Sequence, residues 1–418
     1  MLKGDWLQPC IRVGSTLPHL LTKPTKTRTV VAVKCETVQP DKPLAIYVHV
    51  PFCNRKCPYC GFYSEPIGTY DIGRVLAALV TELDRYNLQR PARTVYVGGG
   101  SPSCLPQGQL LRLLEQITQR VGVGSEFTVE VNPDQIDEHL LERLCGLGVN
   151  RLSVGGQSFE DRELEFLARG YKGHKIVEVV HQARRAGFDN INLDLIFAIP
   201  GSTLQSWQRN LATAMELDVE HISAYSLTYE KGTLLYKRRQ ANQIDVTDEE
   251  TDRAMYDLAI DQLVAAGFEH YEISNFARKA DGRSFECRHN LVYWANEPYI
   301  GIGPGASSYW QGRRTSNVAD VGAYLEAIEQ GKDASGECET PDEPDRACQT
   351  AVLMLRRIKG IDLEEYRQRT GFDVLKMFAE PIWRYQKLGL LAVEHGRLHL
   401  TREALPIADS ILCDFAVV

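Results

Sequence analysis

Three cysteines lie close together in the stretch YVHVPFCNRKCPYCGFYS. Cys53, Cys57 and Cys60 have the spacing CxxxCxxC and directly follow an apolar run that predicts a strand. Three thiolates on one loop can each bind one iron of a [4Fe–4S] cube and leave the fourth iron open to an outside ligand. A structural zinc ion needs a fourth protein ligand close by, and Phe62 and Tyr63 supply none. The spacing therefore predicts an iron–sulfur cluster with an open coordination site; zinc or incidental thiols are the alternative.

Apart from Cys287, which is considered below, the other cysteines show no ligand spacing and are expected to be ordinary thiols. The chain has 11 cysteines, an odd number, scattered over 418 residues. Such a distribution is not a secreted disulfide framework, and it favours a reducing compartment such as the cytoplasm. The cysteines outside the cluster motif are residues 10, 35, 104, 145, 287, 338, 348 and 413.

The composition is that of an ordinary globular chain, with 44% hydrophobic and 24% charged residues. The net charge of -8 argues against a surface that neutralises nucleic-acid phosphates. The longest apolar run, Ile191 to Pro200, is interrupted by Asn192 and Asp194 and is too short to span a bilayer. We therefore expect neither a nucleic-acid partner nor a membrane span.

Apolar runs of strand character alternate with segments of helical spacing from residue 45 onwards. The predicted strands are Ala45–Val50, Thr94–Val97, Phe127–Val131, Arg151–Val154, Ile191–Ile199 and His221–Ser226. Helical spacing follows at Val75–Tyr86, Gln109–Arg120 and Leu204–Glu216. This alternation predicts an α/β fold with a parallel sheet, curled or closed, whose ligands bind at the carboxyl ends of the strands.

The two ends of the chain differ from this core. Residues 1–42 carry seven Lys or Arg and three acidic residues, which predicts a flexible leader or an organelle transit peptide. Residues 331–345 contain six acids with Gly and Pro and are predicted to form a linker. Residues 346–418 combine helices with a two-strand ribbon, Leu390–Val393 and Leu398–Leu400, in a winged-helix-like order. Because this tail is not basic, a packing or partner-docking role is favoured over DNA binding.

Further motifs follow the cysteine loop, in the order GGGSPS, EVNP, SVGGQSF, DLIFAIPG, ISAYSLTYEKGT and RHNLVYW. Together with YVHVPFC they resemble the radical S-adenosylmethionine superfamily. The closer resemblance is to the family that contains oxygen-independent coproporphyrinogen III oxidase and the HemW haem chaperones. It covers about residues 45–418 and implies a partial (β/α)6 barrel within residues 43–330, followed by a small C-terminal helical, winged-helix-like domain. It also implies that the open iron of the cluster chelates the amino and carboxylate groups of S-adenosylmethionine.

The resemblance assigns a set of residues to the cofactor: Tyr47, Tyr59, Phe62, Gly99, Gly100, Ser101, Glu130, Gln157, Arg169 and Asp194. The glycines let the backbone approach the methionine amine, and Glu130 matches a carboxylate that holds the ribose hydroxyls. Gln157 matches a second ribose or carboxylate contact, Arg169 a partner of the methionine carboxylate, and Asp194 a further acid at a strand end. A solvated surface role is the alternative for the polar residues, and core packing for the two tyrosines.

Two positions depart from relatives within this resemblance. The porphyrinogen oxidases carry a fourth cysteine two positions after the third, where this chain has Phe62, as the HemW-type proteins do. Tyr171 stands where the pattern after Arg169 usually has histidine. The first departure weakens the oxidase interpretation.

The RHNLVYW motif supplies His289, Asn290, Tyr293 and Trp294, with Cys287 just upstream. An imidazole beside aromatic rings is a candidate haem site, because haem iron binds a nitrogen ligand and the macrocycle needs flat apolar faces. The HNxxYW pattern of the HemW-type proteins supports this interpretation. A histidine satisfied within the core is the alternative, and Cys287 is either a second candidate ligand or a buried thiol.

The resemblance implies a haem chaperone that binds haem and hands it to an apo-haemoprotein, with the cluster and S-adenosylmethionine in a supporting role. An electron donor for the cluster and a homodimer are further partners that it suggests. The alternative function is an oxidoreductase that cleaves S-adenosylmethionine and decarboxylates coproporphyrinogen III. On the first interpretation the chain is a carrier and not primarily an enzyme.

Overall fold

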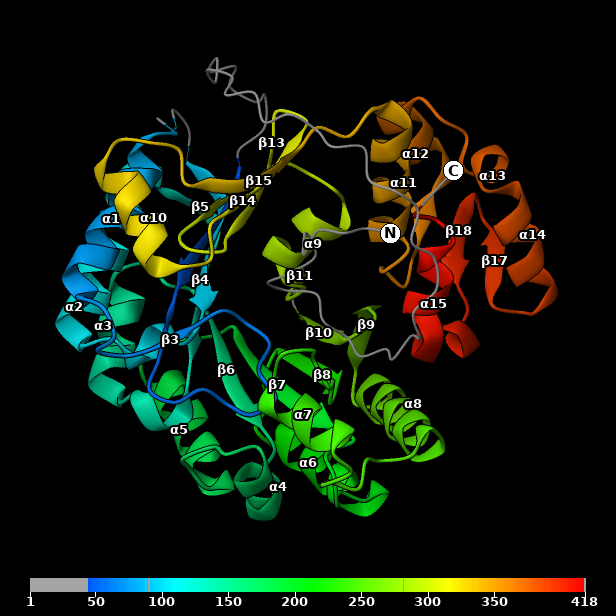
Figure 1. The fold of residues 1–418 in the computed structure, drawn as a ribbon. Coiled ribbons are helices and arrows are strands. Elements are labelled where there is room, and N and C mark those ends of the chain that lie inside the picture. The colour runs from blue at the N-terminus through cyan, green and yellow to red at the C-terminus, as the bar shows by residue number, and fades with distance from the viewer. Residues whose placement is uncertain (1–43, 87, 89–90, 281, 417–418) are drawn as a thin grey trace.

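The computed structural model describes residues 44–416 except 87, 89–90 and 281 (Figure 1). The predicted leader, residues 1–42, lies outside the described residues, and so do Cys10 and Cys35. The described chain consists of a curved sheet with helices outside it and a C-terminal region on its other side.

The parallel part of the sheet is built from the predicted strands. They are β1 (Ala45–Val50), β4 (Ala92–Gly99), β5 (Val123–Val131), β6 (Arg151–Gln157), β7 (Ile191–Phe197) and β8 (His221–Ser226). They pair in parallel in the order β1–β4–β5–β6–β7–β8, with His49 opposite Gly98 and Val129 opposite Leu152. Their side chains are almost all buried, because helices cover one face and loops and side chains fill the other.

Helices follow the strands and cover the outer face, as Figure 1 shows. They are α1 (Ile72–Asp84), α2 (Gln107–Val121), α3 (Glu138–Gly146), α4 (Asp161–Phe166), α5 (Gly173–Arg185) and α6 (Leu204–Glu216). Their apolar residues recur at helical spacing, as in α2, which buries Leu110, Leu114 and Ile117 on one face. Helix α6 begins where predicted because Thr203 and Ser206 form a capping box.

The sheet continues beyond both ends of this parallel core. On one side, β12 (Tyr299–Ile302) pairs in parallel with β1, and β13 (Ser307–Trp310), β14 (Arg313–Asn317) and β15 (Ser335–Glu339) follow antiparallel. On the other, β10 (Asn275–Ala280) pairs antiparallel with β8 and carries β9 (Phe268–Glu272) and β11 (Arg283–Ser284). Among the described residues the two ends of the strand order are not paired with each other, so the barrel is open. The prediction of a partial barrel is confirmed.

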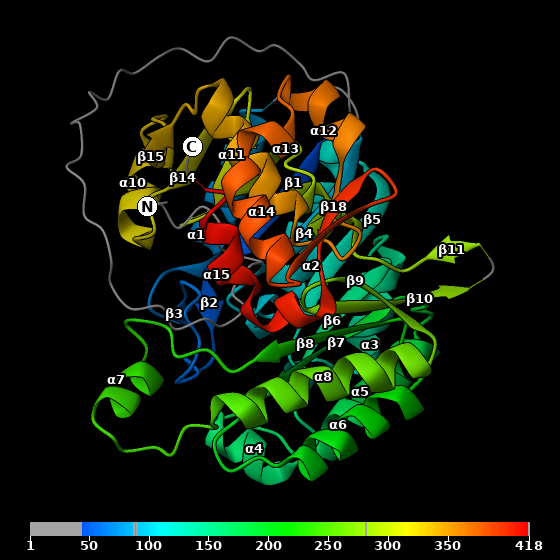
Figure 2. The ribbon, with the colours of Figure 1, turned by 90° about the vertical axis from the view of Figure 1, so that its right-hand side faces the viewer.

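Four helices of the described chain come between the parallel core and the C-terminal region in the sequence. They are α7 (Leu234–Gln240), α8 (Glu249–Ala265) and α9 (Arg288–Trp294), and α10 (Val321–Glu329) lies between β14 and β15. Figure 2 shows α8 beside α6, while α7 projects from the end of the barrel that also carries the short strands β2 (Phe52–Cys53) and β3 (Glu65–Pro66).

The C-terminal region has a small antiparallel sheet with helices around it. Its strands pair in the order β16 (Ile361–Asp362), β18 (Arg397–Leu400) and β17 (Leu391–Glu394). Its helices are α11 (Glu343–Met354), α12 (Leu363–Thr370), α13 (Val374–Met377), α14 (Ala379–Lys387) and α15 (Ala408–Cys413). The predicted ribbon is β17 and β18, and a third short strand completes the winged-helix-like order.

Two local predictions are corrected. Part of the expected linker, residues 331–345, is regular, because Ser335–Glu339 forms β15 on the edge of the main sheet and α11 begins at Glu343. The acids of β15 are tolerated because an edge strand exposes them to water. The sequence of Tyr271–Phe276 also predicts one strand, but the structure has the end of β9, a turn and the start of β10 there.

None of the helices in the described part of the chain combines the length and the apolar character that a bilayer span requires.

Candidate functional site

The three cysteines lie on a loop that closes one end of the barrel. The short parallel pair β2 and β3 brackets this loop, and Ile67 donates its amide hydrogen to the carbonyl of Cys53 at 2.9 Å. Within the loop, the amide of Cys60 donates to the carbonyl of Cys57 at 3.2 Å. All three cysteines line a cavity of about 270 Å³ at the carboxyl ends of the strands, here called the strand-end cavity. The loop thus places the thiols where a parallel sheet binds its ligands.

The three thiols suit a cluster better than a single ion. Among the described residues, no three His, Cys, Asp or Glu side chains converge on one metal position. A zinc ion needs four ligands around one centre, whereas a [4Fe–4S] cube takes each thiolate on a different iron. Cys53, Cys57 and Cys60 line one cavity, so they are the residues that would hold such a cluster.

Most of the residues predicted to bind the cofactor line the same cavity. They are Tyr59, Phe62, Gly99, Gly100, Ser101, Glu130, Gln157, Arg169 and Asp194, and Asn290 of the second motif joins them. Buried carboxylates and a guanidinium therefore face one space together with the thiols. That donor set is complementary to a molecule with hydroxyl groups, an amine and a carboxylate, as S-adenosylmethionine is.

Glu130 is a buried carboxylate with two protein donors. The Tyr96 hydroxyl donates to its Oε1 at 2.8 Å, and the Gly99 amide donates to its Oε2 at 3.1 Å. Burial raises the pKa of Glu130 to about 7, and the nearby charge of Asp194 acts in the same direction. Burial also raises the pKa of Asp194, whose carboxylate accepts hydrogen bonds from Ser153 and Asn192. Glu130 therefore loses its proton near neutral pH.

The affinity for S-adenosylmethionine should fall as the pH drops from 8 to 6. If Glu130 accepts hydrogen bonds from the ribose, binding favours the ionised carboxylate, and a protonated Glu130 must first lose its proton. For a pKa of about 7 this costs roughly tenfold in affinity across that interval. Calorimetry at several pH values should show the slope in the wild type, and Asp194→Asn should move the slope to lower pH because the charge of Asp194 raises the pKa of Glu130. Glu130→Gln should remove it, and an unchanged slope in that variant would contradict the ribose contact.

Arg169 is held in place by several acceptors. Its Nη2 donates to the carbonyl of Gly155 at 3.0 Å and to Oδ1 of Asn132, and its Nη1 lies 3.5 Å from the Cys57 sulfur. Its Nε donates to the Tyr171 hydroxyl at 2.9 Å, and that hydroxyl donates to the Gly155 carbonyl at 2.5 Å. Tyr171, the second departure from the relatives, therefore positions the guanidinium beside the cysteine loop.

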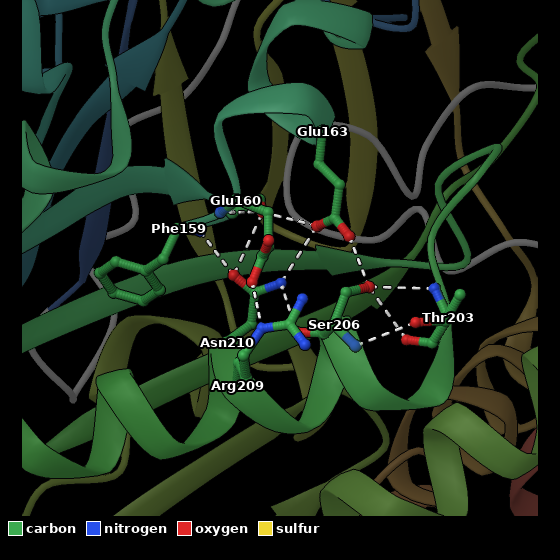
Figure 3. A network of polar contacts seen from close by, with 8 residues as sticks. Phe159, Glu160, Glu163, Thr203, Ser206, Arg209 and Asn210 are labelled. Atoms are coloured by element: carbon green, nitrogen blue, oxygen red, sulfur yellow. Dashed lines mark hydrogen bonds and ion pairs between the residues drawn. The ribbon is translucent and has the colours of Figure 1, made fainter.

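Gln157 ends β6 in a left-handed backbone conformation, with φ of 67°. A non-glycine residue adopts this conformation at a cost, which the surrounding structure must offset. The next residue, Ser158, donates to Glu163 at 2.6 Å, and Asn210 of α6 donates to the same carboxylate at 3.0 Å (Figure 3). Ser206 donates to the other oxygen of Glu163 at 2.8 Å. This network attaches the turn after Gln157 to helix α6.

The glycines of GGGSPS are required by protein packing. A Cβ on Gly98 would lie 2.6 Å from the Glu130 carboxyl carbon, and one on Gly100 would lie 2.3 Å from the Phe52 carbonyl oxygen. Gly99 has φ of 109°, and a Cβ there would lie 2.5 Å from the His49 ring. The motif was expected to make room for the methionine amine; it makes room first for Glu130, whose position depends on it.

Tyr47 is the predicted cofactor residue that does not line the cavity. It is 1% exposed, and its hydroxyl lies 3.1 Å from Nδ1 of His49. Its ring packs in a small cluster with Tyr96, Cys287 and Ala306. The core-packing alternative fits this position, and the ring of Tyr47 packs beside that of Tyr96, which lines the cavity.

The histidine of the second motif is enclosed in the core. His289 is 0% exposed, and its Nδ1 and Nε2 lie 2.8 Å from the Thr94 hydroxyl and 3.0 Å from the Tyr293 hydroxyl. Burial lowers the pKa of His289 to about 3. Both nitrogens are thus engaged, so the expectation that His289 ligates haem iron does not fit this conformation, and the core alternative does.

The neighbours of His289 are buried as well. Tyr293 and Trp294 belong to an apolar cluster with Tyr299 and Leu353, which joins α9 to the C-terminal region. Cys287 is 0% exposed, and burial raises its pKa to about 12. Of the second motif, only Asn290 lines the strand-end cavity.

Sequence reasoning missed several residues of the cavity wall. Asn132, Tyr96, Ser153, Tyr225 and Thr228 line it without having been predicted. Asn132 carried a signal, because it belongs to the quoted EVNP motif and its Nδ2 donates to the Ser101 hydroxyl at 3.0 Å. Tyr225 and Thr228 likewise belong to the ISAYSLTYEKGT stretch.

Two family descriptions match the chain. The first is the Radical SAM superfamily, over residues 47–214, and the second is the HemN C-terminal domain, over residues 342–407. The first match covers the strands and loops that line the strand-end cavity up to α6. The second covers the C-terminal sheet and most of its helices.

The chain is also similar to proteins named Heme chaperone HemW. It is 32% identical to the one from Lactococcus lactis over 90% of this chain and 98% of the relative. It is 34% identical to the one from Bacillus subtilis over 88% of this chain and 98% of the relative. Among solved structures, coproporphyrinogen III oxidase (HemN) from Escherichia coli, described as a radical SAM enzyme, has a TM-score of 0.77 at 22% identity, covering 90% of each chain. That likeness concerns the fold.

Proposed function

Because the chain belongs to the HemW family of radical SAM proteins, we propose that it binds haem and transfers it to apo-haemoproteins. The observation that carries this proposal is the similarity to HemW relatives over 98% of their length. Phe62 supports it, because this residue lines the strand-end cavity where the porphyrinogen oxidases carry a further cysteine. The proposed partners are an apo-haemoprotein acceptor, an electron donor for the cluster and a second copy of the chain in a homodimer. The proposed location is the cytoplasm.

The strand-end cavity would serve the cluster and S-adenosylmethionine. Cys53, Cys57 and Cys60 would hold the cluster, which when bound supplies one-electron chemistry at its open iron. Arg169 would pair with the methionine carboxylate, and Glu130 would accept hydrogen bonds from the ribose. In the carrier these groups have a supporting role, so binding of the cofactor does not require its cleavage.

The second candidate function is the oxidative decarboxylation of coproporphyrinogen III. The resemblance of the chain's motifs to the family that contains the porphyrinogen oxidases favours it, as does the match of residues 342–407 to the HemN C-terminal domain. Phe62 argues against it for the reason given above. The two functions share the cluster and the cofactor, so only the fate of the tetrapyrrole separates them.

Haem transfer tests the proposal directly. Anaerobically reconstituted protein loaded with haem should pass it to an apo-haemoprotein, and the absorption band of the holo-acceptor should grow as that of the donor falls. Free haem at the same concentration is the control, because spontaneous uptake must be subtracted. If the acceptor gains haem no faster than the loaded protein releases haem to water, the transfer is not direct. That result would count against a chaperone.

Replacing His289 with alanine should lower stability and leave haem binding in place. The variant loses hydrogen bonds to Thr94 and Tyr293 in the core, so the free energy of unfolding should fall by about 2–4 kcal/mol. His139→Ala is the control, because that side chain is 70% exposed and should change stability by less than about 0.5 kcal/mol. Denaturant melts and haem titrations check both effects. A loss of the haem absorption band with unchanged stability would restore His289 as the ligand.

A further inference from the structure

A second cavity adjoins the strand-end cavity and has no assigned role. Its volume is about 1330 Å³, and we call it the outer cavity. Arg55, Lys56, Cys57, Cys60, Gly61 and Phe62 line both cavities, so the cysteine loop is their shared wall. The other walls come from residues 231–238 around the start of α7, residues 165–168 at the end of α4, and the segment from β13 to β15. The outer cavity can therefore take a ligand much larger than S-adenosylmethionine.

Part of the lining comes from aromatic residues. They are Phe62, Tyr63 and Phe166. Leu234, the first residue of α7, also lines the cavity, and 51% of this apolar residue is exposed. Arg238 lies one helical turn further along, so both side chains occur on the same face of α7. This face pairs an apolar contact with a cationic one.

Some of the basic residues that line the outer cavity have no ion-pair partner among the described residues. Arg55, Lys231 and Arg238 form no ion pair with any residue that the structure describes, whereas Lys56 donates to the Phe62 carbonyl and to Ser64. The acidic groups of the lining are Glu165, Asp320 and Glu337, and Asp320 is engaged as the N-cap of α10. Unpaired cations beside aromatic and aliphatic surface suit a flat apolar ligand with carboxylates at its edge.

We propose that the outer cavity binds haem, with its propionates on Lys231 and Arg238 and its ring against Leu234 and the aromatic side chains. This inference rests on the proposed function, and it names the haem site of that function. No histidine lines this cavity among the described residues, so the macrocycle is held by its edge and faces rather than by an imidazole. Such a hold weakens with salt and releases haem readily, as a carrier requires.

Hemin titrations on the whole anaerobically reconstituted protein test the site. Lys231→Glu combined with Arg238→Glu should weaken hemin binding about tenfold or more, because two charge-assisted contacts become repulsive. Leu234→Asp should also weaken it. Lys237→Glu is the matched control, since Lys237 is an exposed residue of the same helix outside the lining and should change the affinity less than about twofold. The iron content of the cluster should be the same in all variants.

Haem dimethyl ester separates the propionate contacts from the ring contacts. The wild type should bind the ester about tenfold more weakly than hemin, whereas the Lys231→Glu, Arg238→Glu double variant should bind the ester more tightly than hemin, because its carboxylates repel only the free propionates. If the wild type binds no hemin, the proposed function itself fails. If it binds hemin and the double variant and Leu234→Asp bind it equally well, the function stands and this site is wrong. If the double variant loses affinity for S-adenosylmethionine and keeps its affinity for hemin, the outer cavity binds the cofactor and the inference is wrong.

Discussion

Cys57→Ala protein reconstituted without oxygen should contain almost no cluster iron, whereas the wild type should hold about four irons and as many sulfides per chain. The three cysteines line one cavity, and each thiolate would bind a different iron of one cluster. Loss of one thiolate should therefore remove the irons together rather than one at a time. Iron and sulfide analysis with the visible absorption of the cluster measures this effect.

Cys145→Ala is the matched control for this experiment. Cys145 lies near the end of α3, away from the strand-end cavity, and its loss should leave the iron content unchanged. Stoichiometric zinc in the wild type that is lost in Cys57→Ala would show a structural ion in place of the cluster. Retention of the full iron content in Cys57→Ala would remove this cysteine from the ligand set.

Arg169→Ala should bind S-adenosylmethionine about 10- to 150-fold more weakly than the wild type. Loss of a charged hydrogen-bonding partner costs roughly 1.5–3 kcal/mol, and each 1.4 kcal/mol is tenfold in affinity. The guanidinium lies beside the cluster loop, where the cofactor's carboxylate would meet the open iron. Calorimetry on the reconstituted protein gives the dissociation constant.

Two further variants distinguish direct contact from general damage. Arg162→Ala removes an exposed arginine of α4 and should bind the cofactor as the wild type does. Tyr171→Phe keeps the guanidinium but removes the hydroxyl that holds it, so its affinity should fall about 2- to 12-fold, as for one hydrogen bond. Wild-type affinity in Arg169→Ala with a full cluster would exclude the residue from the site.

The parallel core was predictable because its signals are local. The strand Ala45–Val50 and the helix Leu204–Glu216 have the bounds expected from the sequence. A strand buried on both faces is a continuous apolar run, and the capping residues Thr203 and Ser206 mark the start of the helix. Neither signal depends on knowing which segments meet in space.

The departures depend on contacts between distant segments. Ser335–Glu339 is acidic and rich in linker residues, but it pairs with β14 at the sheet edge. His289 resembles a ligand in the sequence, yet Thr94 of β4, 195 positions away, engages one of its nitrogens. Such pairings follow from the fold as a whole and leave no pattern near either residue.

The candidate site was predictable for the residues that belong to a recognisable sequence motif. The cysteine loop, Glu130, Arg169 and Asp194 all line one cavity, although their contacts with a cofactor stay a prediction. The role of Tyr171 in holding Arg169 and the space that Gly98 leaves for Glu130 required the structure, because both depend on side-chain geometry.

Haem binding and coproporphyrinogen III turnover, measured on one anaerobically reconstituted sample with S-adenosylmethionine and a competent reductant, test the central claim most directly. The account predicts that the protein binds haem near stoichiometrically and forms no protoporphyrinogen from coproporphyrinogen III. Repeated turnover of coproporphyrinogen III per cluster, with no stoichiometric haem binding, would contradict it and identify a decarboxylase.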